Sequence, residues 1–148
     1  MESSPEVAVR RVALTREAPL VPRGLWKRVT WNGRGVVFLC GTLGAAFDAW
    51  QRQLAVMSAA DAYLAQQIGL DAVEQLMDDL EGEARAAVEG EGGALLPRRS
   101  PGYGEMPLAL SREILDALDA TKKIGVSLTT TNLLVPSKSV TAICEIKT

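Results

Sequence analysis

Histidine is absent from the 148 residues, and its absence limits the catalytic chemistry that the chain can perform. Without an imidazole there is no Ser-His or Cys-His couple, and no histidine can bind zinc or cobalt. Carboxylates, lysines, tyrosines and two thiols remain as titratable groups. Cys40 and Cys144 lie too far apart in sequence to indicate a metal motif or a disulfide framework, so we expect two buried thiols. The sequence therefore excludes a hydrolase built on an imidazole base.

The segment 90–107 is the first candidate for a binding loop. Its glycines and prolines prevent a helix or a strand across much of its length. A loop this long in a compact domain is usually functional or disordered. Its two neighbouring arginines, Arg98 and Arg99, do not alternate with aromatic residues as in a single-strand nucleic-acid binder. The segment is therefore expected to be functional or disordered, and its paired arginines are only a weak signal for nucleic acid.

Length and charge restrict the class of protein further. The chain is long enough for one domain with its own core, and 47% hydrophobic with 23% charged residues is ordinary for a soluble protein. A net charge of −2 gives no electrostatic basis for binding nucleic acid. No apolar run approaches the roughly 20 residues of a membrane span, and the charged start does not resemble a signal peptide. We expect a cytoplasmic protein without nucleic-acid or membrane partners.

The elements that must position this loop begin with a strand and a long helical region. The β-branched run 36–40 favours a buried strand. From residue 45 to residue 88, apolar residues recur every three or four positions, which predicts helix. A break is expected near Ser58, a plausible N-cap, or near Gly69, after which Asp71 could cap a second segment. The acidic residues between the apolar positions indicate a solvated face: Asp78, Asp79, Glu81 and Glu83.

The N-terminal segment 1–35 is interrupted by prolines and glycines. Short strand pieces are expected at 7–9 and 12–14, and the alternation of tryptophans with polar residues in 26–31 suits a half-buried strand. We expect this segment to form an N-terminal arm or an edge element that precedes a domain of residues 36–148.

The C-terminal part is expected to hold a short helix and two strands. Ser111 resembles an N-cap, and Gly125 would end the amphipathic helix that follows it. Strands are expected at 126–131 and 139–146, with Pro136 in the turn that lets them pair antiparallel. This order of elements favours a single α+β domain with a mixed or antiparallel sheet packed with a long helix pair.

Three segments together resemble the activation-domain family of cobalamin-dependent methionine synthase. Residues 98–104 resemble its R-x-x-P-G-Y stretch, residues 124–129 its G-x-x-L-T segment, and residues 135–140 its P-x-x-S-V turn and strand. Three motifs in the same order and at similar spacing are more specific than the first motif alone. The resemblance covers roughly residues 36–146 and includes, less closely, the helix through Glu74.

The resemblance implies a fold and a ligand site. The family is α+β with an antiparallel sheet, and it binds S-adenosylmethionine in a shallow groove. Matched position by position, the ligand-binding residues implied here are Glu74, Arg98, Ser100, Gly102 and Tyr103. A guanidinium suits the ligand's carboxylate and a glutamate suits its ammonium. The backbone at the serine and glycine would approach the ligand, and the tyrosine would offer it a rigid face.

The function implied is that of an activation component in a cobalamin-dependent methyltransferase system. It would support reductive remethylation of cobalamin on a separate corrinoid protein or methionine synthase core, with a flavodoxin- or ferredoxin-type electron donor. The sulfonium methyl is already activated, so placement rather than a protein base is required. Thr130 stands where the family usually has a glutamate, and Gly104 replaces a proline. Two alternatives stay open: a non-catalytic regulatory module that binds a nucleotide or a corrinoid protein, and a scaffold that has lost the ligand.

Overall fold

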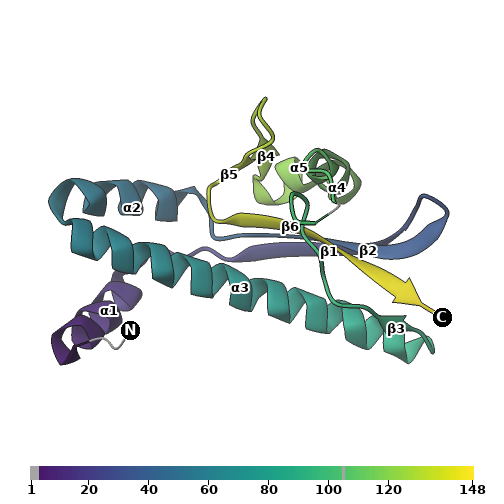
Figure 1. Ribbon diagram of the computed structural model, residues 1–148, viewed down its shortest axis with the longest axis horizontal. Coiled ribbons are helices and arrows are strands. Elements are labelled where there is room, and N and C mark those ends of the chain that lie inside the picture. The colour runs from purple at the N-terminus through teal and green to yellow at the C-terminus, as the bar shows by residue number, and fades with distance from the viewer. Residues whose placement is uncertain (1–3, 105) are drawn as a thin grey trace.

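The computed structural model describes residues 4–104 and 106–148, so residues 1–3 of the N-terminal segment and residue 105 of the loop lie outside the described part. Its centre is a four-stranded antiparallel sheet with the order β1-β2-β6-β3, beside a two-stranded ribbon of β4 and β5 (Figure 1). The strands are β1 (Arg23–Trp31), β2 (Arg34–Thr42), β3 (Ala94–Leu95), β4 (Ser127–Leu128), β5 (Leu134–Val135) and β6 (Ser139–Lys147). The helices are α1 (Pro5–Glu17), α2 (Ala45–Met57), α3 (Ala59–Gly90), α4 (Leu110–Leu118) and α5 (Ala120–Ile124). The predicted α+β class with an antiparallel sheet and a long helix is confirmed.

Helices cover both faces of the sheet, with α3 on one side and α4 on the other (Figure 1). Strands β2 and β6 pair along their length, and successive side chains alternate between the two faces. One face buries Val36, Phe38, Cys40 and Ile143 against α4. The other face buries Val37, Leu39, Ala142 and Cys144 against α3. Both strands are therefore apolar on both faces, which explains the continuous apolar run of β2.

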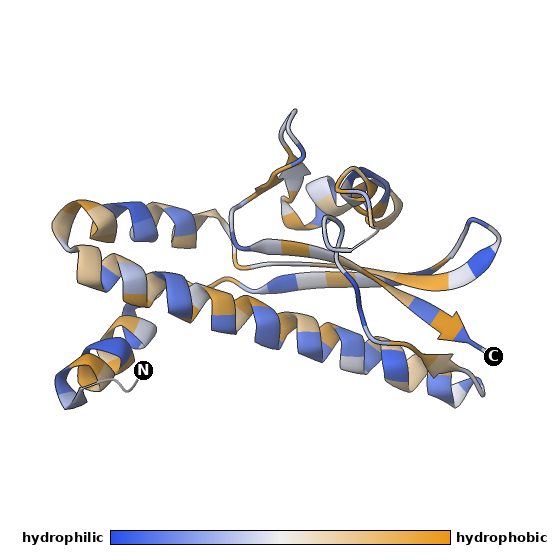
Figure 2. Ribbon diagram, in the orientation of Figure 1, coloured by the Kyte–Doolittle hydropathy of each residue, from blue (hydrophilic) through white to orange (hydrophobic). Residues whose placement is uncertain are grey.

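Helix α3 is 32 residues long, and its apolar residues alternate with polar ones along its length (Figure 2). The predicted break at Ser58 is confirmed, because the Ser58 hydroxyl accepts a hydrogen bond from the Asp61 amide at 3.1 Å. The break predicted at Gly69 is wrong, and Asp71 caps nothing there but pairs with Arg11. A Cβ at Gly69 would lie 2.7 Å from the Phe47 ring, so this glycine allows α2 and α3 to approach closely. No helix within residues 4–104 and 106–148 has the length and apolar character needed to cross a membrane.

The strand pieces expected at 7–9 and 12–14 are wrong, because both lie in α1. The Ser4 hydroxyl caps this helix, and Pro5 occupies its first turn, where a missing N–H has no cost. Leu14 is the residue that α1 buries, in a cluster with side chains of α3. The strand predicted around the two tryptophans is confirmed as part of β1. This edge strand pairs with β2, so it joins the segment 1–35 to the sheet of the domain that was predicted to begin at residue 36.

Two predictions for the C-terminal part are wrong. Ser111 is not an N-cap: α4 begins one residue earlier, and Ser111 is buried. The last two predicted strands do not pair with each other, because a turn closed by the hydrogen bond from the Thr129 amide to the Leu133 carbonyl folds β4 back onto β5. Strand β6 joins the main sheet instead. Gly125 is confirmed as a C-cap with φ +73°, although Asp119 with φ +52° divides the helical segment into α4 and α5.

Candidate functional site

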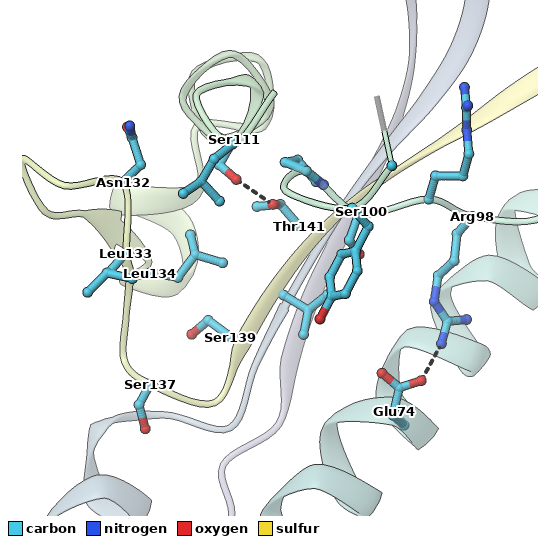
Figure 3. Close-up of a pocket in the computed structure, with 16 residues that line it drawn as sticks. Glu74, Arg98, Ser100, Ser111, Asn132, Leu133, Leu134, Ser137, Ser139 and Thr141 are labelled. Carbon is cyan, nitrogen blue, oxygen red and sulfur yellow. Dashed lines mark hydrogen bonds and ion pairs between the residues drawn. The ribbon is translucent and has the colours of Figure 1, made fainter. Parts of the chain in front are cut away.

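A groove of about 840 Å³ opens at the edge of the main sheet, between α3, the loop that follows β3, α4 and the turn before β6 (Figure 3). Four of the five predicted ligand-binding residues line it, and they come from two elements: Glu74, Arg98, Ser100 and Tyr103. A volume of several hundred Å³ is typical of small-molecule sites. The structure therefore brings most of the predicted site residues together in a groove large enough for a nucleoside-sized ligand.

Arg99 fixes the direction of the loop's side chains, because its backbone pairs with β6. The Arg99 amide donates to the Ile143 carbonyl and the Ile143 amide donates to the Arg99 carbonyl, both at 2.9 Å. Side chains of an extended segment alternate, so Arg98 and Ser100 lie on the face opposite to Arg99. That face is the one covered by α3.

Arg98 binds three carboxylates of α3. Its Nη2 donates to Glu74 at 2.8 Å, and its Nη1 donates to Asp78 and to Glu81 at 2.8 Å each. The Arg98 side chain is 17% exposed, whereas that of Glu74 is 64% exposed. Figure 3 shows Arg98 reaching across the groove wall to Glu74 on the helix. The two groups that were predicted to bind a zwitterion thus bind each other in this structure.

Glu81 anchors this cluster and corrects the prediction of a fully solvated acidic face. Its side chain is 12% exposed and accepts hydrogen bonds from Arg85 and Arg98 at 2.8 Å. Burial alone would raise the pKa of Glu81, but the two guanidinium groups outweigh it and hold that pKa below its usual value. Burial acts to lower the pKa of Arg98, and its carboxylate partners raise it overall. Asp79 and Glu83 do lie on the exposed face, as predicted.

Gly102 lies in the turn of the loop and does not line the groove directly. Its φ is +91°, and its amide donates to the Met106 carbonyl at 2.9 Å. A Cβ at this position would approach Leu108 Cδ1 to 3.1 Å. The residue is therefore required for the shape of the loop, and its approach to a ligand stays a prediction. Tyr103 is 76% exposed, so it is free to contact a ligand rather than anchor the loop.

The wall opposite α3 consists of hydroxyl side chains that the sequence analysis missed. Ser111 and Thr141 share a buried hydrogen bond of 2.9 Å, visible in Figure 3, and Ser139 donates to Thr42 at 2.7 Å. Small hydroxyl residues at 137, 139 and 141 alternate along the chain. That period of two was the available signal for a polar strand edge.

Helix α2 holds the turn that leads into this wall. Asp48 accepts hydrogen bonds from the Ser137 amide and the Ser137 hydroxyl, both at 2.8 Å. The next residue, Lys138, is buried against Phe47, and burial lowers the pKa of its ammonium. Thr130, which replaces the glutamate of the family pattern, is exposed in the neighbouring turn and is not part of the groove lining.

Comparison with solved structures identifies this architecture. The crystal structure of the MetH reactivation domain bound to AdoHcy matches with a TM-score of 0.71 and 15% sequence identity, over 98% of this chain and 67% of that chain. The chain has the fold of the MetH reactivation domain. No protein-family model and no curated protein matches the sequence.

The match confirms the fold that the three motifs predicted. At 15% identity, it rests on the arrangement of elements rather than on shared side chains. In the reactivation-domain fold of this chain, the R-x-x-P-G-Y loop and α3 form one wall of the groove, and the P-x-x-S-V turn and β6 form much of the other. Two of the three motifs that carried the resemblance therefore meet at one site, whereas the segment 124–129 does not line the groove.

Proposed function

We propose that the chain binds S-adenosylmethionine in this groove and thereby supports reductive remethylation of cobalamin held by a separate protein. The observation that carries the proposal is the meeting of Arg98 and Glu74, from different elements, on the wall of a groove of about 840 Å³. The fold adds support, because the matching MetH reactivation domain was solved with AdoHcy bound.

The charged wall suits the amino-acid end of this ligand. That end carries a carboxylate and an ammonium on one carbon, and the wall offers a guanidinium and a carboxylate 2.8 Å apart. Binding would replace the Arg98–Glu74 pair by two pairs with the ligand. Asp78 and Glu81 hold Nη1 of Arg98, so Nη2 is the nitrogen that the exchange would free.

The remaining groove surface suits an uncharged, partly apolar body. Leu108, Leu133 and Leu134 line it together with the hydroxyl wall. Leu133 is 61% exposed, and the unprotected apolar surface at the rim is available to a ligand. Tyr103 is the aromatic side chain of the lining and offers a flat face with a polar tip.

When bound, S-adenosylmethionine supplies an activated methyl group and the partner's reduced cobalamin accepts it. The residues of this chain then need only to hold the ligand and leave its sulfonium accessible, because neither reactant requires a protein base. A flavodoxin- or ferredoxin-type protein would supply the electron. The corrinoid protein or methionine synthase core would act in trans.

Isothermal titration calorimetry with S-adenosylmethionine and S-adenosylhomocysteine tests the binding step. We expect weak binding of both, because part of the groove lining, including Tyr103 and Leu133, is exposed to solvent. Wild-type protein that releases no heat at millimolar ligand would refute the proposal and favour a scaffold that has lost its ligand.

A spectroscopic assay tests the supporting role. A cobalamin-bearing partner in the Co(II) form, a low-potential electron donor and S-adenosylmethionine should lose the Co(II) spectrum faster when this chain is present. Ligand binding together with an unchanged rate would instead favour a regulatory module that holds the nucleotide without supporting turnover.

A further inference from the structure

Strand β1 is the outermost strand of the main sheet, and its outer edge is open. On the inner side all nine of its residues pair with β2. On the outer side, no backbone group within residues 4–104 and 106–148 pairs with it. In an antiparallel sheet every second residue of such a strand directs both its amide and its carbonyl outward. The edge is therefore long enough to receive another strand by main-chain hydrogen bonds.

The apolar side chains of β1 are only partly covered. Leu25, Val29 and Trp31 pack against the core cluster beneath α4, yet each stays partly exposed. The residues of β2 that face the same cluster are at most 3% exposed: Val36, Phe38 and Cys40. A strand added along the edge of β1 would cover the apolar surface that β2 does not reach, as cross-strand neighbours do in a sheet.

The β1–β2 hairpin is basic, although the chain has a net charge of −2. Between residues 18 and 47 the sequence has four cationic residues and no aspartate or glutamate: Arg23, Lys27, Arg28 and Arg34. Arg28 pairs with Glu91, and Arg34 pairs with Glu145. Among the described residues, Arg23 and Lys27 form no ion pair. Both alternate with Leu25 and Val29 on the face toward α4, so the open edge carries positive charge between apolar residues.

A second copy of the chain does not suit this edge. The antiparallel register in which two β1 strands overlap over all nine residues places the two Lys27 side chains directly opposite each other. Like charges in that position destabilise a pair of strands, and a lysine on an edge strand protects it against self-association. An acidic side chain opposite Lys27 would instead stabilise the pairing.

We propose that the outer edge of β1 binds an extended acidic segment of a partner protein, which adds a fifth strand to the main sheet. Backbone groups of β1 hold the segment in register. Carboxylates of the segment lie opposite Arg23 and Lys27, and apolar side chains lie opposite Leu25 and Val29. No residue of β1 lines the groove, so this surface is separate from the proposed ligand site.

The first test uses a capped peptide with this pattern, Thr-Thr-Val-Glu-Glu-Thr-Val-Ser-Glu, whose first residue is placed opposite Trp31. A neutral residue stands there because Glu113 already accepts a hydrogen bond from the Trp31 indole at 2.7 Å. In ¹⁵N-labelled protein, the peptide should protect alternate amides of β1 from hydrogen exchange. It should bind about tenfold more tightly than the same peptide with lysine in place of each glutamate. Equal affinities of the two peptides, or no protection of β1 at millimolar peptide, would overturn the inference.

The second test separates strand pairing from simple charge attraction. Two further peptides carry N-methyl groups on alternate amide nitrogens, one on each of the two alternate sets. Only one set faces β1 in an added strand, so only one of these peptides should lose its binding. An equal loss with both, or a loss with neither, would show that no strand is added and would overturn the inference.

The third test uses variants of the full chain. Lys27→Glu should reverse the preference, so that the lysine peptide binds better than the glutamate peptide. Arg52→Glu makes the same charge change at an exposed position of α2 and is the matched control, which should keep the wild-type preference. Equal effects of the two variants would reduce the interaction to net charge and overturn the inference. Amides of β1 that become protected at high protein concentration without peptide would identify a second copy as the occupant, with the same consequence.

Discussion

The two walls of the groove satisfy their polar groups in different ways. On the α3 wall, Arg98 is paired with three carboxylates, two of which are mostly exposed. On the β6 wall, neutral hydroxyls pair with each other in buried positions, as Ser111 does with Thr141. Ion pairs in contact with water exchange partners at little cost, whereas a buried hydroxyl pair is costly to open. The difference suggests that the α3 wall rearranges on binding and the β6 wall acts as a fixed template.

The largest effect is expected from Arg98→Ala, which removes the cation of the α3 wall. If this wall binds the ligand carboxylate, affinity for S-adenosylmethionine should fall by about 1.5–3 kcal/mol, the loss typical of a charged hydrogen bond. Arg28→Ala, which removes an arginine paired with Glu91 outside the groove, is the matched control. Calorimetry that finds equal losses for both variants would remove the α3 wall from the binding site.

On the β6 wall, a change of similar size is expected in the free energy of unfolding rather than in ligand affinity. Ser111→Ala leaves the buried Thr141 hydroxyl without its partner and should cost about 1–3 kcal/mol of unfolding free energy. Adding Thr141→Val removes the second hydroxyl as well and should recover much of that loss. Urea unfolding of the two single variants and the double variant measures the coupling. A double variant with fully additive losses would show that the pair is not the unit that stabilises this wall.

Gly102→Val should act on the loop that connects the walls. A branched residue at φ +91°, with its Cβ directed at Leu108, should strain the turn by roughly 1–2 kcal/mol and displace Arg98 and Tyr103. Ligand affinity should therefore fall by more than stability does. Thermal unfolding and calorimetry on the same samples compare the two, and equal losses would mean that the glycine serves only the turn.

Lowering the pH should weaken the ion pairs of the α3 wall, whereas the neutral hydroxyl pairs of the β6 wall do not titrate. The folded-state pKa of Glu81 is lowered, so its stabilising contribution is complete above the unfolded pKa of about 4.3 and is lost as pH falls through the folded value. Stability should decline below about pH 4.3, and Glu81→Gln should flatten that part of the profile. An unchanged slope in urea melts of this variant would show that other carboxylates dominate.

The smallest effect on stability is expected from Glu74→Gln. Glu74 is mostly exposed, and pairs of this kind contribute about 0–1 kcal/mol. Ligand binding should nevertheless weaken, because the ammonium would lose its partner. A variant that binds S-adenosylmethionine as wild type does, with unchanged unfolding, would leave Arg98 as the only ligand contact of this wall.

The sequence predicted those parts of the fold that are determined by local patterns. The apolar run of β2, the cap at Ser58 and the glycine-rich loop each have a signature within a few residues, and each was found. The helix α1 had such a signature too, in the cap Ser4 followed by Pro5, but the alternating valines favoured strand instead. The loop motif likewise located Arg98, Ser100 and Tyr103 in the groove.

What the sequence could not predict depends on contacts between distant segments. Ser111 has the residue type of a cap, and only its partner Thr141, thirty positions away, shows that it faces the sheet. In the sequence, Glu81 does not differ from the solvated acidic residues beside it. Only the structure shows that both Arg85 and Arg98 bind its carboxylate. The open edge of β1 follows from the order of strands in the sheet, which no single segment encodes.

The uninterrupted helix α3 has a consequence for how the chain tolerates insertions. Glu74, Asp78 and Glu81 follow each other at four and three residues, which places them on one stripe, while Leu64 and Ile68 further back face α1. Because the rod has no hinge between these stripes, one extra residue near position 71 would rotate everything downstream by about 100° and carry the carboxylates away from Arg98. Seven extra residues would restore the phase to within about 20° but would lengthen the helix by about 10.5 Å, which also removes the carboxylates from Arg98. The continuous helix thus fixes both the angle and the distance between α1 and the groove, and an insertion near position 71 is expected to disrupt one or the other.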